Sequence, residues 1–328
     1  MDTRTSPRLH SDVSTIGLGT WQLGSDWGNV SEADARAVLD ASVASGVTIF
    51  DTADGYGDGR SEQVIGSYLA DNPGHNIFVA TKMGRRGPQV AENFHLAQFR
   101  EWTDRSRTNL RMDTLDLVQL HCPPTVVFSN DEVFDALDLL VSEGAIARYG
   151  VSVETADEAL TAIARPAVSS VQIILNAFRL KPLERVLPAA IEAGVAVIAR
   201  VPLASGLLSG KYTTETVFAE NDHRNYNRDG TSFDVGETFS GVDFEQGIAA
   251  AREFSAIAES LGLTPSVAAL AWVSQLPGVT TVIPGARNVA QAESNASAGD
   301  VLAFGPEVTA AIVDIYDRYF RAAVHPRW

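Results

Sequence analysis

The feature that most constrains this chain is a repeated alternation of short apolar runs with longer amphipathic segments. The runs are rich in β-branched residues, and most of the intervening segments carry helical periodicity. Such alternation is typical of a parallel sheet covered by helices. Eight runs are present, and they predict strands at Ile16–Thr20, Val47–Asp51, Ile77–Lys82, Leu115–His121, Arg148–Ser152, Val168–Ile174, Val195–Arg200 and Val279–Pro284.

Two of the intervening segments carry clear helix signals. Ser31 is placed to cap a helix over Glu32–Ser45, and Gly194 is placed to end a helix over Leu183–Ala193. Eight strand–helix units in 328 residues fit a closed barrel, which has no exposed sheet edges. We therefore predict the α/β class, with residues 1–328 forming a single-domain (β/α)8 TIM barrel.

An open, doubly wound sheet is the alternative architecture. A dinucleotide-binding sheet of that type carries a G-x-G-x-x-G motif after its first strand. The glycine-rich segment 55–59 does not have this spacing and reads equally well as a flexible turn. The barrel is therefore the favoured fold.

One connection breaks the regular pattern. Residues 211–243 are rich in Thr, Asn, Asp, Gly and Arg and show little apolar periodicity. This stretch is too long for an ordinary turn between a strand and a helix. We predict a loop insertion after the seventh strand, which either covers a ligand or is disordered and without function.

Composition limits the partners and the location. A formal net charge of −16 disfavours nucleic acids and anionic membranes, so any phosphate must bind in a local cationic pocket. Cys122 is the single cysteine, and no Cys/His cluster has metal-ligand spacing, so we expect no disulfide and no metal site. The first twenty residues lack the apolar core of a signal peptide, and we expect a soluble, cytoplasmic protein.

Titratable and polar residues stand where the predicted strands end: Asp51, Lys82, His121, Ser152 and Arg200. In a barrel, all of them would reach the C-terminal face, where active sites of this fold lie. Each has a simpler explanation by itself, such as a structural ion pair or a histidine at the core boundary. Their joint occurrence is what favours a common cleft.

Tyr56 completes a set with consistent chemistry. A phenol has a pKa of about 10, which is too high for efficient proton exchange near neutrality. The Lys82 ammonium would favour the phenolate, and Asp51 would keep that ammonium charged. His121 could hold a carbonyl oxygen by a hydrogen bond or share the proton. The set suits carbonyl/alcohol interconversion, which also needs a redox cofactor because no side chain donates hydride.

These residues resemble the aldo-keto reductase superfamily over nearly the whole chain. The family's catalytic tetrad falls on Asp51, Tyr56, Lys82 and His121. The resemblance implies NADPH, or less often NADH, bound across the barrel mouth without a Rossmann domain. The matching segments are Gly17–Trp21, Phe50–Gly57, Ala80–Lys82, Asp116–His121, Gly150–Ser152, Val201–Lys211 and Ile283–Arg287.

The resemblance also implies individual binding residues. Ser152 and Gln172 match residues that hold the nicotinamide carboxamide, and Trp21, Tyr56, His121 and Cys122 would line the substrate pocket. Small residues and a lysine suit a loop that approaches phosphate closely. The remaining implied cofactor contacts are Thr20, Trp21, Asp51, Arg200, Pro202, Leu203, Ser205, Gly206, Leu207, Ser209, Lys211, Gly285, Arg287, Gln291 and Asn295.

Three positions depart from the family pattern. Val153 stands where Asn is frequent, and Ser294 replaces the usual Glu at the adenine end. Arg200 occupies the position of an aromatic ring that stacks on nicotinamide. Its guanidinium plane could stack there and favour the reduced cofactor, or it could form a salt bridge to a nearby carboxylate. Arg287 can neutralise a 2′-phosphate, so NADPH is the expected cofactor.

Other functions stay open at this point. The same site could run as an alcohol or sugar dehydrogenase, and the barrel could be a redox-sensing binding protein that resembles potassium-channel β subunits. A phosphate-binding isomerase or aldolase with Lys82 as a Schiff-base amine is a third alternative. The expected partner is a small-molecule carbonyl or alcohol, while the substrate and the oligomeric state are not predicted.

Overall fold

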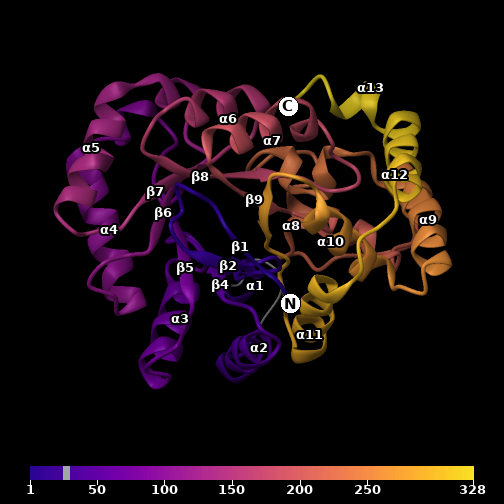
Figure 1. Cartoon of the computed structure of the whole chain (residues 1–328), viewed down its shortest axis with the longest axis horizontal. Coiled ribbons are helices and arrows are strands. Elements are labelled where there is room, and N and C mark those ends of the chain that lie inside the picture. The colour runs from indigo at the N-terminus through magenta and orange to yellow at the C-terminus, as the bar shows by residue number, and fades with distance from the viewer. Residues whose placement is uncertain (25–29) are drawn as a thin grey trace.

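The computed structural model describes residues 1–24 and 30–328, and its centre is a closed barrel of eight parallel strands (Figure 1). The strands lie in chain order around the barrel. The first and last strands meet where Gly17 N–H donates to Val282 O (2.8 Å) and Gly19 N–H donates to Pro284 O (3.0 Å). The predicted TIM barrel is confirmed. Its strands are β3 (Leu18–Gly19), β4 (Ile49–Asp51), β5 (Phe78–Met83), β6 (Leu117–His121), β7 (Tyr149–Ser152), β8 (Val168–Ile174), β9 (Ala196–Arg200) and β10 (Val279–Val282).

The strand ends differ somewhat from the prediction. The expected first strand, Ile16–Thr20, is reduced to β3 because Ile16 pairs only through an isolated bridge to Val282. The last strand stops at Val282, although Ile283 N–H still donates to Ala199 O (3.1 Å), and Pro284 has no N–H to continue the ladder. All eight runs nevertheless overlap a strand of the barrel.

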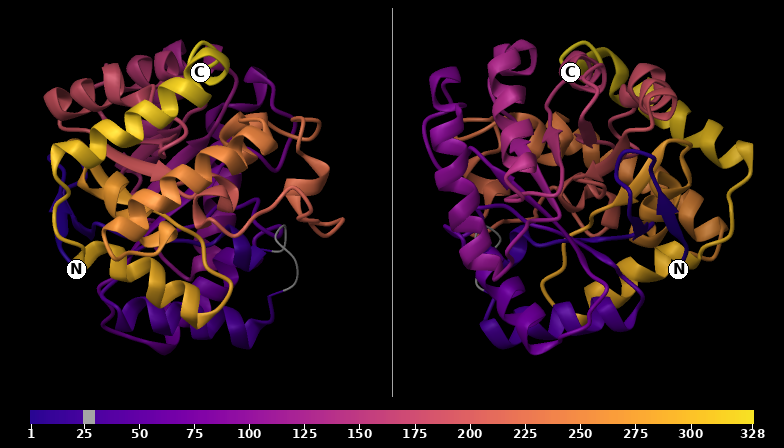
Figure 2. Two further views of the ribbon diagram at one scale, coloured as in Figure 1. Left: turned by 90° about the vertical axis from the view of Figure 1, so that its right-hand side faces the viewer. Right: turned by 60° about the vertical axis from the view of Figure 1, so that its left-hand side comes forward.

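Helices surround the barrel, and α11 packs against α2 to complete the circle (Figures 1 and 2). Ser31 caps α2 by accepting from Asp34 N–H (3.1 Å), as predicted. Gly194, with φ of 69°, ends α7, also as predicted. The helices are α1 (Trp21–Gly24), α2 (Glu32–Ala44), α3 (Arg60–Asp71), α4 (Leu96–Leu110), α5 (Asp131–Ser142), α6 (Ala156–Ile163), α7 (Pro182–Ala193), α8 (His223–Tyr226), α9 (Phe244–Ser260), α10 (Pro265–Gln275), α11 (Val289–Ser297), α12 (Pro306–Tyr319) and α13 (Arg321–Val324).

An N-terminal hairpin that the sequence did not predict closes the other end of the barrel. Strands β1 (Thr3–Thr5) and β2 (Asp12–Ser14) pair antiparallel. Arg8 N–H donates to Gly194 O (3.0 Å), just before β9, and the connecting turn places Leu9 in the barrel interior. Leu9 packs there with Ile49, Ala196 and other apolar side chains from the strands. The barrel interior is thus a packed core, and a ligand site is left to the opposite, C-terminal mouth.

The 211–243 segment lies between β9 and α9 and carries its own short helices. It follows the turn η3 (Ala204–Ser209) and includes α8, η4 (Val235–Glu237) and η5 (Phe239–Gly241). Rings of Tyr212, Phe218 and Phe239 pack on one another and on Phe244 of α9. This aromatic cluster attaches the segment to the barrel. Its residues are not regularly spaced in the sequence, so apolar periodicity could not predict the packing.

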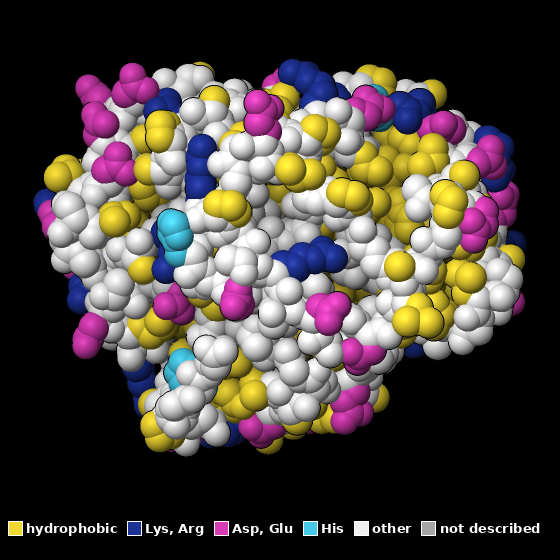
Figure 3. All heavy atoms as spheres, viewed as in Figure 1, with side chains coloured by type: hydrophobic (Ala, Val, Ile, Leu, Met, Phe, Trp, Pro, Cys, Tyr) yellow, Lys and Arg dark blue, Asp and Glu magenta, His cyan; other side chains and the backbone are white. Residues whose placement is uncertain are grey.

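The surface mixes charges of both signs. Figure 3 shows acidic side chains spread around the rim of one face and interspersed with basic and apolar groups. Within residues 1–24 and 30–328, no single helix has the length and apolar character to cross a membrane. The pair α9 and α10 reaches that length and composition only together, with a bend of 84° between the two helices.

Candidate active site

The four residues of the predicted tetrad come from three successive strands and the loop after the first of them, and they meet at the C-terminal mouth. Asp51 ends β4, Lys82 lies near the end of β5, and His121 ends β6. Lys82 Nζ donates to Asp51 Oδ1 (2.5 Å) and lies 3.3 Å from the Tyr56 hydroxyl oxygen. The Tyr56 and His121 rings meet edge to face, with centroids 5.9 Å apart. Sequence spacing alone could not establish this convergence.

Neighbouring groups fix the buried Lys82–Asp51 pair. Lys82 Nζ also donates to the backbone oxygen of Thr52 (2.8 Å), so all three of its donor directions are used. The second Asp51 oxygen accepts from Gln172 Nε2 (2.7 Å) and from Gln119 Nε2 (3.5 Å). Gln119 was not predicted as a site residue, because a glutamine inside an apolar strand run gives no separate signal.

Burial and charge set the protonation states at this site. Burial raises the pKa of Tyr56, although the Lys82 ammonium acts in the opposite direction. Burial would lower the pKa of Lys82, but Asp51 and Tyr56 together raise it. Burial, together with Arg85 and Lys82, holds the pKa of His121 well below its usual range. At neutral pH the site therefore holds a protonated phenol, an ammonium and a neutral imidazole.

A cavity of about 710 Å³ opens beside Tyr56 and extends over the ends of β9 and β10. Its wall contains most of the residues implied as cofactor contacts, drawn from segments far apart in the chain. These are Thr20, Trp21, Asp51, Gln172, Arg200, Pro202, Leu203, Ser205, Gly206, Ser209, Lys211, Gly285, Arg287, Gln291 and Asn295.

Four of the residues named from the sequence as cofactor or substrate contacts lie outside the cavity wall. Leu207 is buried against α9, where it contacts the position that a side chain on Gly247 would occupy. Ser152 is buried, with its hydroxyl 3.3 Å from the Cys122 sulfur. His121 contacts the Tyr56 ring, and Cys122 Sγ lies 3.6 Å from Arg200 Nη2, so each touches a residue of the wall. For these four, a direct contact with cofactor or substrate stays a prediction.

The cavity wall also contains residues that sequence analysis missed. Arg224 and Glu237 belong to the 211–243 segment, whose irregular composition gave no signal for individual positions. Arg224 is held by the Asp222 carboxylate (Nη2–Oδ2 2.5 Å) and the Tyr212 hydroxyl (2.5 Å). The other unpredicted members of the wall include Gln22, Tyr212, Ser266 and Asn288.

The wall suits an extended, phosphate-bearing cofactor. Lys211, Arg224 and Arg287 bring cationic side chains to a protein whose net charge is −16. Ser205 and Gly206 adopt positive φ angles of 54° and 96°, and such turns present backbone N–H groups to anions. A side chain at Gly206 would collide with the Tyr212 ring (2.9 Å to Cζ), so the close approach at this turn requires glycine.

Arg200 takes part in a closed ring of alternating charges at the mouth. Its Nη1 lies 2.7 Å from Glu237 Oε2 and its Nη2 lies 3.2 Å from Glu154 Oε2. Arg85 contacts the remaining oxygens, 3.0 Å from Glu154 Oε1 and 3.4 Å from Glu237 Oε1. We call these four residues the ion ring. The salt-bridge interpretation of Arg200 is confirmed, and its side chain lines the cavity as well.

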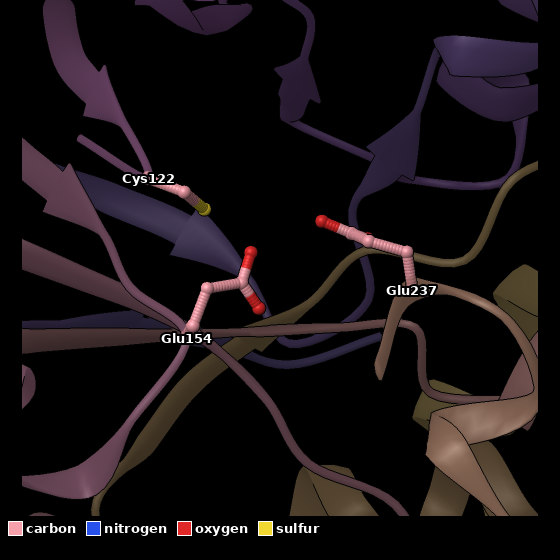
Figure 4. A group of neighbouring side chains, drawn as sticks. All are labelled: Cys122, Glu154 and Glu237. Carbon is pink, nitrogen blue, oxygen red and sulfur yellow. The ribbon is translucent and has the colours of Figure 1, made fainter. Parts of the chain in front are cut away.

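Cys122, Glu154 and Glu237 point toward a common space, a grouping that could suggest a metal site (Figure 4). Each carboxylate oxygen already contacts a guanidinium group of the ion ring. Burial, with a further contribution from Glu154, raises the pKa of Cys122 to about 12, so its sulfur is not a thiolate. We therefore assign this group to the ion ring rather than to a metal.

Comparisons with known proteins agree with this geometry. The sequence profile described as the Aldo/keto reductase family matches residues 15–317. An uncharacterized oxidoreductase of Mycobacterium tuberculosis is 34% identical over 298 residues, which cover 88% of this chain and 85% of that protein. The Schizosaccharomyces pombe protein named aldo-keto reductase yakc [NADP(+)] is 28% identical, with coverage of 86% and 83%.

A solved structure of similar sequence shares the whole fold. The glycerol dehydrogenase AKR11B4 from Gluconobacter oxydans superimposes with a TM-score of 0.79 at 28% identity. The alignment covers 97% of this chain and 96% of that one. Sequence profile, relatives and fold agree over nearly the full length, and the chain belongs to the aldo/keto reductase family of oxidoreductases.

Proposed function

We propose that this protein interconverts a small carbonyl compound and its alcohol with NADP(H), and that Tyr56 is the general acid and base. The observation that carries the proposal is the Tyr56 hydroxyl, 3.3 Å from a buried Lys82 ammonium and at the wall of the 710 Å³ cavity. A phenol next to a fixed cation can release a proton and take it back. The yakc relative, whose name specifies NADP(+), is consistent with this cofactor.

In the direction of reduction, the Tyr56 hydroxyl donates its proton to the carbonyl oxygen. The Lys82 ammonium stabilises the phenolate that remains, and Asp51 keeps this ammonium charged and oriented. His121 is neutral and can hydrogen-bond the same carbonyl oxygen without supplying a proton. NADPH, when bound, supplies the hydride. Lys211 and Arg287 would hold its phosphates, and Gln172 would lie at the nicotinamide end.

Oxidation of an alcohol is the second candidate direction at the same site. The similarity to a glycerol dehydrogenase favours it. The chemistry of the residues is reversible, because a Tyr56 phenolate can take the hydroxyl proton of an alcohol. A panel of aldehydes, ketones and polyols, assayed with both coenzymes, would identify the preferred direction.

We place the protein in the cytoplasm on the basis of its single cysteine.

Replacement of Tyr56 by phenylalanine tests the proposal. Tyr56→Phe removes only the hydroxyl, so we expect kcat to fall by about 100-fold or more while the Kd for NADPH stays near the wild-type value. Absorbance of the reduced nicotinamide would follow turnover, and fluorescence titration would give the Kd. Tyr68→Phe, on the outer helix α3, is the matched control and should be fully active. Undiminished turnover in Tyr56→Phe would rule out the proposed role.

A further inference from the structure

We propose that Trp328 is a positioning residue for the active site, because it packs against the backbone that carries both carboxylates of the ion ring. The inference builds on the proposed function but concerns Trp328, which lies outside the tetrad and the implied cofactor contacts. Trp328 itself does not line the cavity. It would act on the reaction only through Glu154, Glu237 and the arginines that these two carboxylates hold.

The ion ring joins four separate parts of the chain. Arg85 follows β5, Glu154 follows β7, Arg200 ends β9, and Glu237 belongs to η4 in the 211–243 segment. Arg200 and Glu237 both line the cavity together with Tyr56. A shift of either carboxylate would therefore move charged groups in the wall next to the reacting phenol. Packing contacts must therefore hold Glu154 and Glu237 in position.

Trp328 supplies that support on the Glu237 side. Its side chain is buried, with 6% exposed, and lies against the glycines on either side of Glu237. A side chain at Gly236 would approach Trp328 Cζ2 to 3.3 Å, and one at Gly241 would approach Cζ3 to 2.9 Å. The backbone that carries Glu237 therefore packs directly on the indole, and the close approach at Gly241 requires glycine.

Trp328 also supports Glu154, through Arg179. The Arg179 guanidinium lies over the indole, 4.0 Å from the ring centroid, and its Nη2 donates to the backbone oxygen of Glu154 (2.8 Å). Ala156 N–H donates to Trp328 O (3.2 Å), two residues further along the same turn. A buried cation over an aromatic face is a directional contact that an aliphatic side chain cannot replace. One indole thus fixes both acidic members of the ion ring.

The direct test compares two substitutions of Trp328 by smaller apolar residues, one aliphatic and one aromatic. We expect Trp328→Leu, which lacks the aromatic face, to lower kcat/KM by about tenfold to 100-fold, as small misplacements of active-site groups do. Trp328→Phe keeps a ring for Arg179 and should stay close to the wild-type value. Trp102→Leu on α4 is the control, since Trp102 is similarly buried but packs on Phe94 and Phe99. Equal losses in Trp328→Leu and Trp102→Leu, or in Trp328→Leu and Trp328→Phe, would overturn the proposal.

A double-mutant cycle with Glu237→Gln tests the route of the effect. If Trp328 acts through Glu237, Trp328→Leu/Glu237→Gln should lose no more activity than the worse single variant. If the activity losses of the two single variants multiply in the double variant, the two residues act independently and the proposal is contradicted.

Hydrogen exchange gives a readout that does not need turnover. Trp328→Leu should speed exchange in peptides covering residues 153–156 and 234–241, while peptides from α4 and α5 keep wild-type rates. Unchanged exchange in the first two peptides would exclude the positioning role, even if no carbonyl substrate is found. Conversely, a wild-type protein without turnover on any carbonyl or alcohol would contradict the proposed function alone, and the exchange result would still decide the role of Trp328.

Discussion

Asp54 is a buried acid two residues before Tyr56, and the tetrad does not use it. Its carboxyl group is fully inaccessible to solvent. Burial, together with the negative charge of Glu62, raises its pKa to about 7, although Arg86 and Arg105 oppose the shift. A carboxyl group with such a pKa changes its charge within the physiological range. The residue therefore links the stability of the active-site loop to pH.

The pH dependence of stability should change in Asp54→Asn. The pKa of Asp54 is about 7 in the folded protein and about 4 in an unfolded chain. Between these values only the folded state keeps the proton, so the free energy of unfolding falls as pH rises from about 4 to about 7, by at most about 4 kcal/mol. An asparagine amide cannot ionise, so the Asp54→Asn variant should be more stable than wild type at pH 8 and similar at pH 4.

Denaturant unfolding of both proteins at several pH values would measure this difference. The wild type should lose stability across the interval, and Asp54→Asn should lose less. Parallel curves for the two proteins would contradict the raised pKa of Asp54.

Among the secondary-structure elements, the pairing of β7 with β8 is a close approach that depends on a glycine. Gly150 of β7 faces Ser170 of β8. A side chain at Gly150 would lie 2.6 Å from the backbone oxygen of Ser170 and would also collide with its hydroxyl. Because β7 carries Ser152 and leads into Glu154, this contact sets the position of one side of the barrel mouth. The sequence motif containing Gly150 thus reflects strand packing as well as any cofactor contact.

Gly150→Ala should therefore destabilise the barrel. Forcing one methyl group into a packed site typically costs about 1–3 kcal/mol. Gly87→Ala is the matched control, because no atom lies nearer than 4.0 Å to the added methyl group. Thermal unfolding should show a lower Tm for Gly150→Ala and an unchanged or slightly higher Tm for Gly87→Ala. Equal Tm values for the two variants would show that the β7–β8 pairing accommodates a methyl group at Gly150, contrary to the prediction.

For the whole molecule, the positions of the charged residues affect the binding of an anionic cofactor more than the net charge does. The net charge of −16 would repel an anionic cofactor at long range, but the cavity wall concentrates Lys211, Arg224 and Arg287. Lys211 and Arg224 belong to the 211–243 segment, and Arg287 lies just before α11. Barrel closure is what brings them to one cavity, so cofactor affinity and global folding are coupled.

NADPH should therefore stabilise the folded protein. A ligand at 100 times its Kd adds about 2.7 kcal/mol to the free energy of unfolding, which a thermal shift assay detects easily. Arg287→Ala should reduce the shift with NADPH more than the shift with NADH, because only NADPH carries a 2′-phosphate. Arg185→Ala, at an exposed site on α7, is the control and should behave as wild type. Equal shifts with both coenzymes in the wild type would argue against Arg287 as the 2′-phosphate ligand.

The sequence by itself determined the features that depend on local patterns. Apolar periodicity predicted all eight barrel strands, and cap residues predicted the start of α2 and the end of α7. The polar residues at strand ends could be recognised because a barrel strand is buried along its length, so a charge stands out where the strand emerges. Asp51, Lys82 and His121 were found in this way.

Only the tertiary structure decided the contacts between distant segments. Glu154, Glu237 and Trp328 lie in stretches without periodicity, and the hairpin β1–β2 is too short to give a strand pattern. Their partners are set by the tertiary fold, because each of these ion pairs and indole contacts joins two segments that are far apart in the sequence. Local sequence patterns therefore predicted the reacting groups. The full set of residues in the cavity wall became visible only in the closed barrel.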